Sequence, residues 1–143
     1  MRSMSAEFCD TNIVVYAYDS TAGVKHDRAR ELLERLWLEG TGAVSVQVLQ
    51  ELFVTLTRKI GRPVDPQTAR SIVADLATWH VVQPTVSDVL AAIDATMRWR
   101  LSFWDAMIVT AAQRAGAGVV WSEDLSANQT FDSVTVRNPL RQT

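Results

Sequence analysis

The chain has 143 residues, the length of one ordinary domain, and its hydrophobic content of 48% is enough to build a full core. It carries 14 basic and 16 acidic residues, which gives a net charge of −2. This excludes a protein that binds nucleic acid through a positive charge spread over its whole surface. We therefore expect a single domain over residues 1–143, with fraying in residues 1–5 and the last few residues, and any polyanion must be bound locally.

Cys9 is the only cysteine, which excludes an internal disulfide and suits a reducing compartment. The first residues lack the long apolar segment of a signal peptide. No apolar run approaches the roughly 18 to 20 residues that span a bilayer. The sequence thus predicts a soluble protein of the cytoplasm.

Short apolar runs recur along the chain, each of four or five residues, and predict buried strands. The predicted strands cover residues 6–9, 42–46, 80–83, 118–121 and 133–136.

Helical patterns fill most of the spaces between these runs. Residues 25–39 place their apolar side chains on one stripe and end at Gly40, while residues 47–61 repeat the pattern and end at Gly61. Three further helices are expected from N-cap residues: one capped by Asp65 and running to about Thr78, one capped by Ser87, and one over residues 102–116 capped by Ser102.

Strands that alternate with helices indicate a parallel sheet, because parallel neighbours need a helical crossover. The expected fold class is therefore α/β, with three layers (α/β/α) and a central, mainly parallel sheet. In such sheets functional groups gather beyond the carboxyl ends of the strands, where the strand order switches.

Carboxylates occur at several of the expected strand ends. Asp10 directly follows the first strand, Glu51 lies in the first turns of the helix after the second strand, and Asp124 follows the strand over residues 118–121. Asp105 lies in the first turn of the helix over residues 102–116, and its spacing alone does not place it beside the others.

Clustered carboxylates repel one another unless a cation neutralises them. Ligation by oxygen alone suits Mg²⁺ or Mn²⁺ rather than zinc, and His26 and His80 show no ligand spacing. Paired ions held by carboxylates can activate a water and stabilise the leaving oxygen in phosphodiester hydrolysis. This chemistry points to a nuclease.

Five segments resemble the PIN-domain ribonucleases, and within them the VapC-type toxins of toxin–antitoxin modules. FCDTNIVVYAYD resembles the family's opening strand and its Asp-Thr-Asn turn. SVQVLQELFVTLTRK resembles the family's helix that carries the second acid. SFWDAMIVTAA is similar to the family's helix that carries the third acid. WSEDL and VRNP are similar to the family's turn that carries the fourth acid and to its closing strand. The resemblance covers nearly the whole chain.

The resemblance implies a metal-dependent endoribonuclease that uses two Mg²⁺ or Mn²⁺ ions. It makes Asp10 the central ligand, with Glu51 on one side and Asp105 and Asp124 on the other. Asn12 and Ser122 match positions that hydrogen-bond within the site. The family further implies an RNA substrate, a homodimer, and a VapB-like antitoxin whose C-terminal segment occludes the acidic site.

Structural roles remain open for single acids, since Asp10 and Asp105 could simply cap helices, and Glu123 could replace Asp124 as ligand. Two other classes of protein also remain open. An aspartate-nucleophile phosphatase would need a second Asp where the chain has Asn12, which counts against it. A binding module could have kept the fold without catalysis.

Overall fold

The computed structural model describes residues 5–141; residues 1–4 and 142–143, which belong to the termini expected to fray, lie outside the described residues. Six strands form one sheet in the order β3-β2-β1-β4-β6-β5, and every neighbouring pair is parallel except β5 and β6. The strands are β1 (Ala6–Cys9), β2 (Gly42–Ser45), β3 (His80–Val82), β4 (Ala117–Trp121), β5 (Thr130–Phe131) and β6 (Val134–Arg137).

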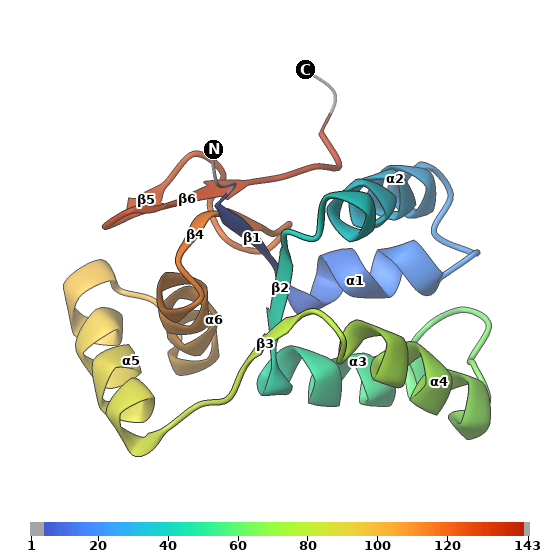
Figure 1. Cartoon of the computed structure of the whole chain (residues 1–143), viewed down its shortest axis with the longest axis horizontal. Coiled ribbons are helices and arrows are strands. Elements are labelled where there is room, and N and C mark those ends of the chain that lie inside the picture. Colours follow the sequence, from blue (N-terminus) through green and yellow to red (C-terminus); the bar gives the residue numbers. More distant parts are fainter. Residues whose placement is uncertain (1–4, 142–143) are drawn as a thin grey trace.

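Helices cover both faces of this sheet, as the expected three-layer fold requires. Figure 1 shows α5 and α6 on one side of the sheet, and α1 and α2 on the other with α3 and α4 beneath them. The helices are α1 (Thr11–Tyr18), α2 (Val24–Glu39), α3 (Val46–Arg58), α4 (Pro66–Leu76), α5 (Val86–Trp99) and α6 (Phe103–Arg114). None of the helices in residues 5–141 is long and apolar enough to cross a membrane.

The helix α1 was not predicted, because its run of β-branched and aromatic residues is more typical of a strand. Asp10 caps its N-terminus by accepting a hydrogen bond from the Thr11 backbone N–H, and Ile13, Val14 and Val15 are buried against the core. Tertiary burial thus overrides the local preference.

Two predicted helix ends were wrong. Ser87 does not cap α5: Thr85 does, because its hydroxyl accepts from the Asp88 N–H while the Asp88 carboxylate accepts from the Thr85 N–H. Gly61 does not end α3, which stops at Arg58. Gly61 instead lies so close to Thr21 that a Cβ there would come within 2.9 Å of its hydroxyl.

The antiparallel hairpin of β5 and β6 was also not predicted. It turns at Asp132 and Ser133, with Asp132 in the left-handed region at φ 55°. The strand β5 has only two residues, too few to give a hydrophobic pattern in the sequence.

The strand order places the switch point of the sheet between β1 and β4. The chain moves outward from β1 through β2 to β3, and then returns to add β4 on the other side of β1. The carboxyl ends of β1 and β4 therefore meet, and the segments that follow them form the edge where ligands bind in sheets of this kind.

Candidate functional site

Asp10 is the central acid of this edge. It lies immediately after β1, its side chain is held by two hydrogen bonds, and the residue is only 6% exposed. The Thr11 N–H donates to Oδ1 at 2.7 Å, and the Ser122 hydroxyl donates to Oδ2 at 2.8 Å. Because Ser122 follows β4, this second bond joins the two strands that flank the switch point.

Burial raises the pKa of Asp10 to about 6, although the hydrogen bonds from Ser122 and Thr11 oppose this rise. The negative charges of Asp124 and Asp105 raise the pKa further, so both carboxylates lie within electrostatic reach of Asp10. No ion pair in residues 5–141 joins Asp10 to a basic side chain. The negative charge of Asp10 is therefore poorly compensated.

Glu51 reaches the same edge from α3. Its Oε1 accepts hydrogen bonds from the Thr11 hydroxyl at 3.1 Å and from the Gln47 side-chain amide at 3.2 Å. Since the Thr11 N–H also binds Asp10, Thr11 connects the two acids. Sequence reasoning did not identify Thr11, because nothing in its spacing predicts a contact with a residue 40 positions away.

Ser122 organises the loop after β4 as well as Asp10. The residue is fully buried, and its hydroxyl oxygen accepts from the N–H groups of Asp124 at 3.2 Å and Leu125 at 3.1 Å. Asn12 lies beside this loop and accepts from the Glu123 N–H at 3.4 Å, while its buried Nδ2 has no hydrogen-bond partner among the described residues.

Glu123 and Asp124 differ in what they contact. The Glu123 carboxylate accepts from the Tyr16 hydroxyl at 2.6 Å and pairs with Lys25 at 2.7 Å. Burial acts to raise its pKa, but Lys25 and Tyr16 outweigh that effect and lower the pKa. Asp124 instead lines the open cleft between α1 and α3, so Asp124, and not Glu123, faces this cleft.

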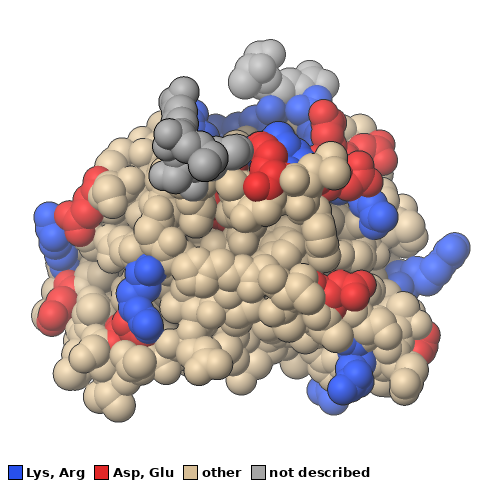
Figure 2. Space-filling view, viewed as in Figure 1, with Lys and Arg blue, Asp and Glu red and all other residues tan. Residues whose placement is uncertain are grey.

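This cleft has a volume of about 420 Å³. Neither Asp10 nor Asp105 is among the residues that line it, although the negative charge of Asp105 acts on Asp10. Sequence reasoning gave no role here to Thr11, Tyr16, Asp19 and Thr55, which do line the cleft. Lys59 lines it too and supplies a positive charge. The view in Figure 2 shows basic and acidic side chains interspersed around the rim of the molecule rather than one broad basic face.

The carboxylate side chains of this site are of the type that binds a hard divalent cation. In residues 5–141 no group of three His, Cys, Asp or Glu side chains is already gathered as a metal site. The site nevertheless combines a buried carboxylate without a counter-cation, two further negative charges that act on it, and a fourth carboxylate tied to it through Thr11. Oxygen ligands of this kind suit Mg²⁺ or Mn²⁺.

Comparisons with known proteins identify the family and the fold of the chain. The family model of the PIN domain matches residues 8–130. No curated protein matches the chain.

Solved structures with the same fold come from several bacteria. A toxin–antitoxin complex from Klebsiella pneumoniae has a TM-score of 0.70 at 18% identity, covering 94% of this chain and 98% of that one. The Mycobacterium tuberculosis toxin VapC20, described as cleaving the sarcin-ricin loop, has a TM-score of 0.64 at 21% identity, covering 83% and 90%. DNA-bound VapBC from Salmonella typhimurium has a TM-score of 0.67 at 15% identity, covering 95% and 99%.

Proposed function

Because the chain belongs to the PIN-domain family, we propose that it is a metal-dependent endoribonuclease and the toxin of a toxin–antitoxin pair. The observation that carries this proposal is the buried Asp10 at the switch point, whose charge no basic side chain among residues 5–141 compensates and on which Asp105 and Asp124 act. An ionised carboxylate that is buried without a counter-cation is costly, and such groups are typical of sites that bind a cation.

The structural relatives support the choice of substrate and partner. One of them is described as a toxin that cleaves the sarcin-ricin loop, and others are toxin–antitoxin complexes. We expect RNA as the substrate, a VapB-like antitoxin as the partner, a homodimer as the assembly and the cytoplasm as the location.

The residues that would hold Mg²⁺ or Mn²⁺ are Asp10, Glu51, Asp105 and Asp124. When bound, one or two such ions supply an activated water for attack on the phosphorus and stabilise the leaving 3′ oxygen, which gives 5′-phosphate and 3′-hydroxyl ends.

The chain itself orients the acids. Ser122 and the Thr11 N–H each bind one oxygen of Asp10, which fixes the plane of its carboxylate. The Thr11 hydroxyl aims Glu51 at the same edge. Lys59 offers the cleft a positive charge that can bind a phosphate of the substrate.

The same acidity explains how an antitoxin could block the site. A cleft with several carboxylates attracts an arginine, which can form paired hydrogen bonds with a carboxylate. We therefore expect a basic side chain of the antitoxin to enter the cleft near Asp10 and compete with the cation.

The test is cleavage of total cellular RNA by the purified protein, freed of any antitoxin, in Mg²⁺ or Mn²⁺ and in EDTA. We expect discrete fragments that disappear in EDTA and a decrease of at least about 100-fold in rate for Asp10→Asn. Asp88→Asn is the matched control, because Asp88 has a similarly small exposed fraction but lies at the start of α5, paired with Arg114. Cleavage by Asp10→Asn at the normal rate would show that the assignment is wrong.

A further inference from the structure

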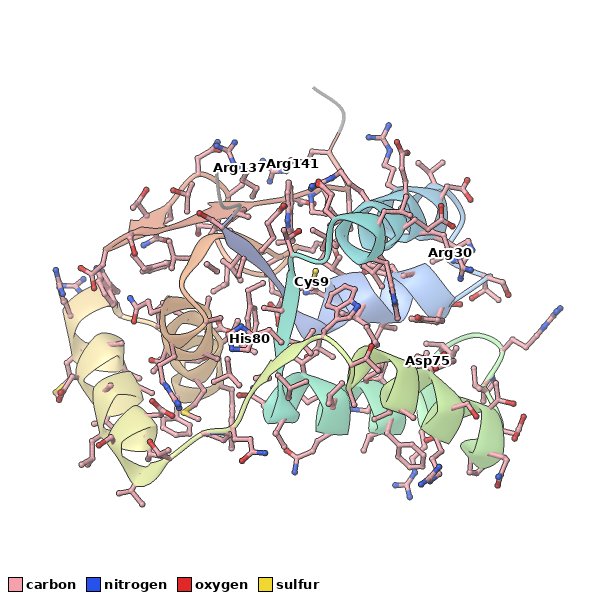
Figure 3. The ribbon with its side chains drawn as sticks, viewed as in Figure 1. Cys9, Arg30, Asp75, His80, Arg137 and Arg141 are labelled. Atoms are coloured by element: carbon pink, nitrogen blue, oxygen red, sulfur yellow. The ribbon has the colours of Figure 1, made fainter. Side chains whose placement is uncertain are left out.

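A second hollow lies at the carboxyl ends of β4 and β6. Its volume is about 430 Å³, and none of the described residues that line it is acidic. Figure 3 labels Arg137 and Arg141 on this side of the molecule. We call it the basic pocket, and its polar and aromatic lining residues are Trp121, Asn128, Arg137, Asn138 and Arg141.

The cations of the basic pocket are available to an anion. Arg137 ends β6 with its residue exposed, and neither Arg137 nor Arg141 forms an ion pair within residues 5–141. A third guanidinium lies next to Arg141, because Nη1 of Arg28 on α2 donates to the Arg141 carbonyl at 3.4 Å. In a chain with a net charge of −2, this is a local concentration of positive charge.

Trp121 adds a fixed aromatic face. Its register with Arg137 in the parallel pair of β4 and β6 puts both side chains on the same face of the sheet. The indole Nε1–H donates to Glu7 at 3.0 Å, and Arg35 in turn holds Glu7 at 2.8 Å, so the ring is oriented before any ligand arrives. A held indole beside guanidinium groups suits a base next to its phosphate.

The loop that follows β4 connects the basic pocket to the acidic cleft. Its Ser122 donates a backbone hydrogen bond to the Arg137 carbonyl at 3.0 Å and a hydroxyl hydrogen bond to Asp10 at 2.8 Å. Further along the loop, Asp124 lines the cleft and Asn128 lines the basic pocket. A strand of nucleic acid that crosses this loop would touch both.

We propose that the basic pocket binds single-stranded RNA, with a base stacked on Trp121 and phosphates held by Arg137 and Arg141. The inference rests on the proposed ribonuclease function, because the bound segment would be part of the RNA whose scissile phosphate occupies the cleft. Stacking on an indole requires an unstacked base, so the ligand is a single strand rather than a duplex.

The test measures binding separately from cleavage. Fluorescence anisotropy of a labelled single-stranded RNA of mixed sequence is followed in the full-length Asp10→Asn protein over a series of salt concentrations. Adding R137Q and R141Q should weaken binding about tenfold and lower the slope of log K against log salt by about 0.7 for each phosphate that an arginine no longer neutralises. Trp121→Leu should weaken binding without changing that slope, because stacking releases no counterions.

The matched control is R70Q, which removes the same charge from α4, a helix that leads to β3 at the opposite edge of the sheet. Its affinity and salt slope should equal those of the Asp10→Asn parent. Unchanged RNA binding in the R137Q/R141Q protein, or an equal decrease of affinity for duplex DNA, would overturn the inference. If the arginine variants bind RNA more weakly while the native protein cleaves no RNA, the pocket stands and the proposed nuclease function fails.

Discussion

Asp10 and Asp88 are two aspartates with nearly the same exposure, 6% and 7%, but Asp10 lies deep in the protein, Asp88 lies near its surface, and their charged neighbours are opposite. Asp88 contacts the Arg114 guanidinium and accepts from the Thr85 N–H, so its pKa is lowered even though burial alone would raise it. Asp10 has no such cation within residues 5–141, and burial raises its pKa to about 6.

The contrast separates a carboxylate whose charge is compensated within the fold from one whose charge is not. At the start of α5 the protein has placed an arginine and a helix cap around the charge, which stabilises the helix. At the end of β1 it has placed two further negative charges near it. Such an arrangement costs stability and is typical of a site whose compensating charge comes from a ligand.

The largest expected difference between the two sites is in their response to pH. A raised folded-state pKa means that the Asp10 contribution to stability is fully present below the unfolded pKa of about 3.9 and is lost as the pH rises through about 6. In EDTA, the free energy of unfolding of the native protein should therefore fall relative to Asp10→Asn by about 2.4 kcal/mol between pH 4 and pH 7.

Urea unfolding of both proteins across this range measures the difference. Adding Mg²⁺ at pH 7 should restore stability to the native protein and not to Asp10→Asn, because the cation neutralises the buried charge. A difference between the two proteins that does not vary with pH would contradict the poor compensation of Asp10.

A smaller effect is expected at Asp88. Asp88→Asn removes the ion pair with Arg114 and the charged half of the capping box, and should lower the free energy of unfolding by about 2 kcal/mol. The lowered pKa of Asp88 makes its stabilisation present at neutral pH and lost only as the pH falls below the usual aspartate range. The deficit measured by urea unfolding should thus be constant between pH 5 and pH 8, unlike the deficit at Asp10.

The smallest effect is expected from the hydroxyl groups that hold the two acids. Ser122→Ala removes a donor to Asp10 and leaves the N–H groups of Asp124 and Leu125 without their acceptor, and should cost about 1 to 2 kcal/mol. It should also raise the pKa of Asp10 further, because the Ser122 hydrogen bond lowers it. Thr85→Ala is the matched change at Asp88, with a cost of about 1 kcal/mol and no effect on Asp10. If the free energy of unfolding depended on pH in the same way for Ser122→Ala and Thr85→Ala, the proposed difference between Asp10 and Asp88 would be wrong.

Much of the fold could be predicted because burial has a local signature. Five of the six strands were expected within one or two residues of their observed bounds, and Gly40 and Ser102 end and begin helices as their residue types suggest. The parallel sheet followed from the alternation of strands and helices. The helix α1 escaped prediction because its side chains favour a strand locally, and only the capping by Asp10 and burial in the core make it a helix.

The candidate site was only partly readable in the chain. Sequence order and resemblance named its four acids, and the positions of Asp10, Glu51 and Asp124 after β1, β2 and β4 followed from the predicted strands. The spacing did not place Asp105, whose charge the structure brings within reach of Asp10. It also gave no indication of Thr11 as the link between Asp10 and Glu51.

The sequence by itself therefore determined the α/β class and most of the elements, because these depend on residue type and short-range periodicity, while its resemblance to a known family named the four candidate acids. Only the tertiary structure decided which charges are compensated and which are not. It paired Asp88 with Arg114 and left Asp10 among acids, and it set Arg137 beside Trp121 through the register of β4 and β6. A charge takes its pKa and its role from neighbours distant in the sequence, and the fold alone brings those neighbours together.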